Sequence, residues 1–277
     1  MQKAGKFIWI LKIIALYFAL FIYRELFIRI LYLVDIRLND MLITGIYNAL
    51  KVALSVIIMK LIVHKKEKLH FDRVTKYLYQ LMMGIIIGFL SFIVIFGIFI
   101  VTGVATIDHF NNISLKGLGL AVGIYMFVGV TEEIFSRGVV GNILKESNNK
   151  YVVYILSSAL FVWMHIRNEG IDIIPMINLF IAGIILIDMY MKSGNLCMCI
   201  GFHFSWNFIQ SCLGFSVSGT GNVNSIFTLS FTGSKQITGG SFGAEGSIIT
   251  SIILILTIFF MSKVNIPSKS ANRAINT

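Results

Sequence analysis

The sequence predicts an all-α fold: a polytopic integral membrane helical bundle of about eight transmembrane helices, with the N- and C-termini both inside. Three observations lead to this prediction. Hydrophobic residues make up 57% of the 277 residues and charged residues only 13%, far from the balance of a soluble domain. Apolar runs of roughly 20 residues, enough to cross a hydrocarbon core about 30 Å thick, recur along the chain. Lys and Arg gather in alternate segments between these runs.

Eight apolar runs are candidate spans, and we expect them to form a single membrane domain over residues 1–277. They cover residues 7–33, 41–63, 81–104, 118–142, 151–166, 171–191, 195–213 and 247–262. The first run contains Arg24, Glu25 and Arg29. Its second half therefore also fits an amphipathic helix at the membrane surface, in which Glu25 and Arg29 pair at i and i+4.

Basic residues orient the bundle, because loops on the cytoplasmic side are enriched in Lys and Arg. With the N-terminus inside, most basic residues fall on inner segments, including the run HKKEKLHFDRVTK at 64–76. The outer segments hold only Arg37, Lys116, Arg167 and Lys235. This topology accounts for the formal net charge of +10, so we expect membrane lipids rather than nucleic acid as the partners of the basic segments.

The fourth run contains three ionisable residues within VTEEIFSRG, residues 130–138. A charged side chain near the middle of a bilayer costs about 2.5–3.5 kcal/mol on insertion scales, so such groups face the bundle interior and commonly mark function. At about 100° per residue, Glu133 and Arg137 project roughly 40° apart, which predicts a bidentate pair. Glu132 has no partner on its own helix and is therefore a candidate general base.

Two later helices offer polar partners for Glu132. The segment FVWMH places His165 one turn after Phe161, and HFSWN places His203 and Asn207 on one helix face. A carboxylate, two imidazoles and a carboxamide can thus converge in one polar cavity. A single histidine in an apolar helix is more often a packed or hydrogen-bonded residue, so the prediction depends on the combination.

These ordered motifs, Glu-Glu-x-x-x-Arg, Phe-x-x-x-His and His-x-x-x-Asn, resemble the signature of the CAAX prenyl protease and bacteriocin-processing (CPBP, or Abi) superfamily of intramembrane endopeptidases. The resemblance covers residues 118–213, the expected catalytic core, and TGGSFGAEGS at 238–247 is similar to a glycine-rich segment of many bacterial members. It implies a peptide-bond hydrolase in a bacterial cell membrane. Its substrate would be a peptide or a membrane-anchored protein, as in peptide or bacteriocin maturation or self-immunity.

The resemblance also implies a role for each motif residue. Glu132 and His165 would hold and deprotonate the attacking water, while His203 and Asn207 would stabilise the tetrahedral oxyanion. The remaining motif residues would support these groups from behind: Glu133, Arg137 and Phe161. This mechanism needs no metal or other cofactor. The alternative is a catalytic zinc ion, with Glu132, His165 and His203 as its candidate ligands.

Two other classes of function fit part of the sequence. A non-catalytic immunity or scaffold protein would keep this fold and its motifs but act by binding. A small-solute transporter would also bury ionisable residues, although transporter sites usually lie on discontinuous helices in paired repeats, and we find no such pairing.

Two regions near the predicted site carry further expectations. If the spans are centred as drawn, His165 lies about 10 Å nearer the outside than Glu132 and His203, so either its helix runs deeper or its assignment fails. The outer loop at 214–246 is rich in Gly, Ser, Thr and Asn, which favours a solvated connector over a cover for a cavity. Glu245 at its end is expected to be structural, because an acid stabilises the following helix N-terminus.

Overall fold

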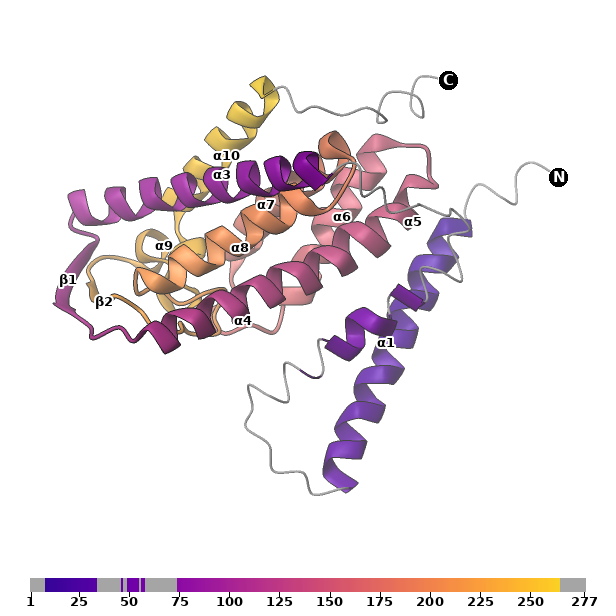
Figure 1. Ribbon diagram of the computed structural model, residues 1–277, viewed down its shortest axis with the longest axis horizontal. Helices are drawn as coiled ribbons and strands as arrows, with labels where there is room; N and C mark the ends of the chain where they lie inside the picture. The colour runs from indigo at the N-terminus through magenta and orange to yellow at the C-terminus, as the bar shows by residue number, and fades with distance from the viewer. Residues whose placement is uncertain (1–7, 34–45, 47–48, 55, 58–73, 265–277) are drawn as a thin grey trace.

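The computed structural model describes residues 8–33, 46, 49–54, 56–57 and 74–264, and the described part is mainly helical (Figure 1). Its helices are α1 Ile8–Leu33, α3 Val74–Val101, α4 Leu115–Glu133, the π-helix η3 Ile134–Gly141, α5 Asn142–Lys145, α6 Lys150–His165, α7 Ile173–Ser193, α8 Cys197–Cys212, α9 Lys235–Thr238 and α10 Ile248–Lys263. Short 3₁₀ turns cover Gly240–Phe242 and Ala244–Gly246. Seven of the eight predicted spans coincide with these helices, whereas the span predicted at 41–63 lies largely outside the described residues.

Helix length separates two classes within the bundle. The helix α3, the continuous helical stretch 115–145 and α7 are long and apolar enough to cross a membrane. The helices α6, α8 and α10 have 16 residues each, which at about 1.5 Å per residue is shorter than a bilayer core. The architecture and these apolar helices indicate an integral membrane protein; the count of eight spans and the placement of both termini inside stay predictions.

The helix α8 packs between α3 and α4 at the centre of the bundle (Figure 1). Glycine permits the close approach of α3 and α8, because a Cβ at Gly84 would overlap the backbone carbonyl of Met198 and one at Gly201 would overlap the carbonyl of Leu81. Small residues at helix interfaces are the usual route to tight packing in membranes. This contact fixes the position of α8, which carries His203 and Asn207.

The described chain also contains strands, which the sequence did not predict. The strand β1 Ala105–Phe110 pairs antiparallel with β2 Phe227–Phe231, with Ala105 opposite Phe231 and a register shift between Ile107 and His109. The two segments are more than 110 residues apart, so no local pattern reveals the pairing. This ribbon lies at the end of the bundle opposite the α5–α6 turn (Figure 1).

The loop at 214–246 is not the solvated connector that its composition favours. Four of its apolar side chains are buried: Phe215, Val217, Phe242 and Ala244. Glycine lets the backbone turn tightly here, since Gly243 has φ +95° and a Cβ would overlap the carbonyl of Ser216. Phe215 packs edge-on against Phe92 and Phe99 of α3. The loop is therefore a packed cover over one end of the helices.

Two charged residues of α7, Asp188 and Lys192, form a hydrogen-bonded cluster with α6 and α10. Asp188 on α7 accepts a hydrogen bond from the hydroxyl of Tyr154 at 2.7 Å and pairs with Lys192 at 2.7 Å. Lys192 also donates to the carbonyl of Met261, near the end of α10, at 2.9 Å. A cation at a helix C-terminus is stabilising, so this cluster holds α6, α7 and α10 together.

Candidate active site

A buried ion pair lies at the junction of α4 and η3. The Nη1 of Arg137 donates to Oε1 of Glu133 at 2.9 Å, and both side chains are completely buried. The expected bidentate pairing does not form: the second guanidinium nitrogen, Nη2, donates to the carbonyl of Gly183 on α7 at 3.4 Å. The guanidinium also lies over the ring of Phe161, 4.5 Å from its centroid. Arg137 thus joins α6 and α7 to the helix that carries the glutamates.

The local backbone explains why ideal α-helical angles do not predict the geometry of the Glu133–Arg137 ion pair. Residues Ile134–Gly141 form a π-helix, in which the hydrogen bonds span one more residue than in an α-helix. The seven residues from Phe135 to Gly141 are all buried. Single π-turns are rare and recur at functional sites, where they change the direction of neighbouring side chains. Here the π-helix begins directly after Glu133.

The carboxylate of Glu133 also orients His203. The Nδ1 of His203 lies 2.8 Å from the same Oε1 that accepts from Arg137. Because that carboxylate is paired with a guanidinium it is ionised and can only accept, so the Nδ1 carries the hydrogen. The other nitrogen, Nε2, is then directed away from Glu133. Sequence reasoning assigned Glu133 only a general supporting role and missed this contact between α4 and α8.

Glu132 meets His165 from the neighbouring helix. The Nε2 of His165 lies 3.8 Å from Oε2 of Glu132, beyond direct hydrogen-bonding distance but short enough for one water to bridge the two atoms. That Oε2 is buried and has no hydrogen-bond partner among the described residues. Lys51 is close enough to Glu132 to interact electrostatically and lies over the Phe135 ring.

The expected depth mismatch of His165 does not exist. Glu132 lies 13 residues before Lys145, the last residue of α5, and His165 lies 15 residues after Lys150, the first residue of α6. At about 1.5 Å per residue, both are roughly 20 Å from the turn that joins the two helices. The prediction centred each apolar run in the membrane separately. The two helices instead share one turn at 146–149, which sets both residues at a similar depth.

The tautomer of His165 follows from its other contact. Its Nδ1 lies 2.9 Å from the carbonyl oxygen of Phe161 one turn earlier. A carbonyl only accepts, so Nδ1 carries the hydrogen, and in the neutral ring the lone pair of Nε2 faces Glu132. The ring also packs against that of Phe161, with centroids 4.7 Å apart. Phe161 therefore fixes both the rotation and the protonation pattern of His165.

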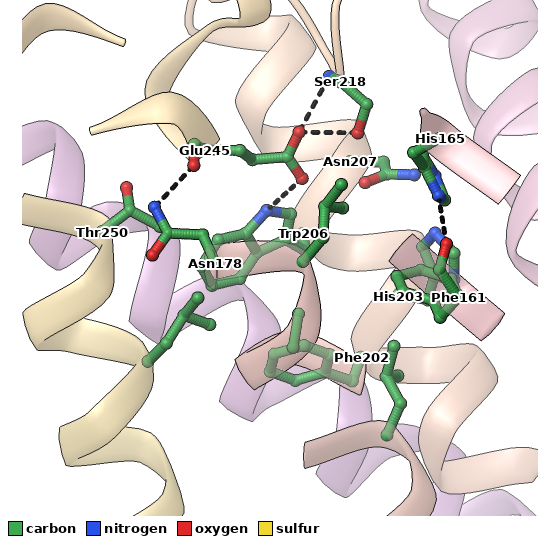
Figure 2. Close-up of a pocket in the computed structure, with 14 residues that line it drawn as sticks. Phe161, His165, Asn178, Phe202, His203, Trp206, Asn207, Ser218, Glu245 and Thr250 are labelled. Atoms are coloured by element: carbon green, nitrogen blue, oxygen red, sulfur yellow. Dashed lines mark hydrogen bonds between the residues drawn. The ribbon is translucent and has the colours of Figure 1, made fainter. Parts of the chain in front are cut away.

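A cavity joins these groups to the cover loop. Figure 2 shows His165, His203 and Asn207 together at one end and Glu245, Asn178 and Thr250 toward the other. The carboxamide of Asn207 is buried and makes no hydrogen bond with another described residue. Glu132 is not among the residues that line this cavity, and its side chain is 25% exposed.

The polar groups at the other end of the cavity are hydrogen-bonded to one another. Glu245 accepts from Nε1 of Trp206 at 3.1 Å and from the backbone N–H and hydroxyl of Ser218 at 2.8 and 2.7 Å (Figure 2). Asn178 donates to the carbonyls of Glu245 and Ser247. Sequence reasoning placed Glu245 outside the site, at a helix N-terminus. Only the fold of the glycine-rich loop places Glu245 in the cavity. The one indication in the sequence was that Glu245 lies in TGGSFGAEGS, the segment similar to a glycine-rich segment of the family.

Residues 114–209 match the family model described as Rce1-like, Type II CAAX prenyl endopeptidase Rce1-like. Over this segment the chain is similar to the Rce1-like domain of that family. The match confirms the family predicted from the three motifs, and it includes every motif residue from Glu132 to Asn207. No curated protein and no solved structure matches the chain. Members of this family are intramembrane proteases, which makes the chain a relative of membrane-embedded hydrolases.

The His, Cys, Asp and Glu side chains of the described residues do not form a metal site. Within the described ranges, no group of three or more His, Cys, Asp or Glu side chains is close enough together to hold a metal ion. The Nδ1 atoms of the two histidines are also engaged, by the carbonyl of Phe161 and by Glu133. The zinc alternative therefore has no clustered ligand set among the described residues.

Proposed function

We propose that the protein is an intramembrane endopeptidase that hydrolyses a peptide bond of a peptide or membrane-anchored protein with water activated by Glu132. The observation that carries this proposal is the convergence of Glu132 and His165, 3.8 Å apart, beside a cavity lined by His203 and Asn207. These four residues come from α4, α6 and α8, and all of them lie within the segment similar to the Rce1-like domain.

The gap between Glu132 and His165 suits the attacking water. Both groups facing the gap are acceptors when Glu132 is ionised and His165 is neutral, so one water can donate one hydrogen to each. This orientation leaves an oxygen lone pair free to attack a carbonyl carbon. As the C–O bond forms, Glu132 takes the proton from the water. Glu132 later returns this proton to the leaving amine as the C–N bond breaks.

His203 and Asn207 would stabilise the negative charge on the carbonyl oxygen during attack. The carboxamide N–H₂ of Asn207 is a neutral donor with no competing partner in the described part of the chain. The Nε2 of His203 becomes a donor only when its ring is protonated, and the Glu133 carboxylate at 2.8 Å compensates that positive charge. Losing one such donor typically lowers kcat by about 10²–10³.

A role in bacteriocin maturation or self-immunity and a place in a bacterial membrane belong to this proposal as well. They rest on the resemblance of the three ordered motifs to the bacteriocin-processing superfamily. Incubating purified protein in lipid vesicles with a peptide library would test the hydrolytic core. We expect cleavage by the wild type that Glu132→Gln abolishes and that 1,10-phenanthroline leaves unchanged. Cleavage that Glu132→Gln retains would refute the proposed base, and loss with the chelator would restore the zinc mechanism.

A further inference from the structure

The cavity beside the proposed catalytic groups is lined by a single carboxylate and by no Lys or Arg side chain. Its walls come from α6, α7, α8, α10 and the cover loop, and its volume is about 40 Å³. Apart from the two histidines, Glu245 is the one ionisable residue among those that line it. This composition sets the cavity apart from the paired charges of Glu133 and Arg137 behind it.

Glu245 is held by neutral donors alone. The indole of Trp206 donates to Oε1, and the backbone N–H and hydroxyl of Ser218 both donate to Oε2. A carboxylate has about four acceptor positions, so three bonds leave one on Oε1 open. Charged groups taken out of water are normally paired, and the lining of this cavity supplies no cation to pair with Glu245.

The remaining walls suit the stem of a long side chain. The apolar part of the lining is formed by Leu179, Ala182, Leu186, Phe202 and Leu254. Lys and Arg bury their methylene stems along apolar surface while the charged head reaches a polar partner. Trp206, which lines the cavity and contacts Glu245, presents an indole ring of the kind that attracts cations.

We propose that this cavity is a substrate subsite that takes a Lys or Arg side chain, with Glu245 pairing with its charge. The inference rests on the proposed function, because it assigns the occupant as a residue next to the scissile bond. His165, His203 and Asn207 lie at one end of the same cavity and Glu245 toward the other (Figure 2). A peptide positioned for hydrolysis at the first end thus directs a neighbouring side chain to the second. An apolar side chain would leave the carboxylate without a cationic partner in the cavity.

A positional peptide library, with the products sequenced by mass spectrometry, tests the specificity. The wild type should cleave peptides with Lys or Arg at one position near the cleavage site at least tenfold better than peptides with Gln or Leu there. Glu245→Gln should reduce this preference to less than threefold. In Glu245→Gln the side-chain N–H₂ can face the indole N–H of Trp206, so that two donors oppose each other. The double variant Trp206→Phe/Glu245→Gln removes the indole donor and so tests the loss of charge without this clash. Glu169→Gln, which neutralises an exposed residue outside the cavity, should keep the preference.

A binding measurement separates failure of this inference from failure of the proposed function. With Trp9 and Trp163 replaced by Phe, Trp206 is the remaining tryptophan, and its fluorescence reports on the cavity. Titration with n-butylguanidinium should give a saturable change whose Kd rises at least tenfold in Glu245→Gln, while pentan-1-ol shows no such dependence. Binding without any Glu132-dependent cleavage would overturn the proposed function and keep the subsite. Cleavage with no basic preference, or a preference that both Glu245 variants retain, would overturn the subsite alone.

Discussion

Replacement by Gln should destabilise the protein far more at Glu133 than at the adjacent Glu132. Glu133 is completely buried, and its Oε1 accepts hydrogen bonds from Arg137 at 2.9 Å and His203 at 2.8 Å. Glu133→Gln removes the negative charge and leaves the Arg137 guanidinium uncompensated. Breaking a buried ion pair from one side typically costs about 3–5 kcal/mol of folding free energy. Glu132 is 25% exposed and its Oε2 makes no hydrogen bond within the described structure, so Glu132→Gln should cost less than about 1 kcal/mol.

Equilibrium unfolding of both variants in mixed detergent micelles, followed by circular dichroism, measures this difference. Glu133→Gln/Arg137→Met provides the matched control, because it removes both charges. Its cost should fall below the sum of the two single substitutions by at least about 1 kcal/mol, as expected for residues in direct contact. Equal costs for Glu132→Gln and Glu133→Gln, or additive costs in the double variant, would refute the assignment of Glu133 as the buried structural partner.

Three further predictions follow from the packing, the oxyanion donors and the cover loop. Gly84→Ala should destabilise the protein by more than about 2 kcal/mol, because its Cβ would overlap the Met198 carbonyl. Gly97→Ala has open space around it and should be neutral or slightly stabilising. Equilibrium unfolding of the two variants measures the difference in their free energies of unfolding. Asn207→Ala should lower kcat by about 10²–10³ with little change in KM or stability, and a change confined to KM would contradict its role as an oxyanion donor. The backbone N–H of Ile173 and then Lys235 hold the pKa of Asp172 below its ordinary value of 3.8. This carboxylate therefore stabilises the fold above about pH 4 and loses that effect as pH falls, so Asp172→Asn should show a smaller loss of stability between pH 6 and pH 3 than the wild type; identical pH profiles would contradict this.

The motif residues could be found from the sequence because apolar helices make rare polar residues conspicuous. Glu132, His165, His203 and Asn207 each stand within a run of apolar residues, and all four lie within residues 114–209, which match the Rce1-like family model. Helix periodicity also indicated that Glu132 would need a partner from another helix. The structure brings it to 3.8 Å from His165.

The contacts that escaped prediction depend on geometry that local sequence does not encode. The π-helix after Glu133 breaks the 100° periodicity on which the bidentate pairing with Arg137 was based. The pairing of β1 with β2 joins segments far apart in the chain. Glu245 lies in a loop whose composition resembles that of a solvated connector. Its position in the cavity depends on the packing of Phe215 and Phe242 beneath the loop.

The most direct test of the central claim is a quantitative comparison of peptides and new protein N-termini in cells that carry the wild-type chain or Glu132→Gln, at matched abundance in the membrane. Because Glu132→Gln should fold normally, loss of a product reports on chemistry rather than on stability. We predict that a set of N-termini present with the wild type disappears with Glu132→Gln, while the uncut precursors accumulate. Identical N-termini in both strains, under conditions in which the gene has a phenotype, would contradict the protease assignment and favour a protein that acts by binding.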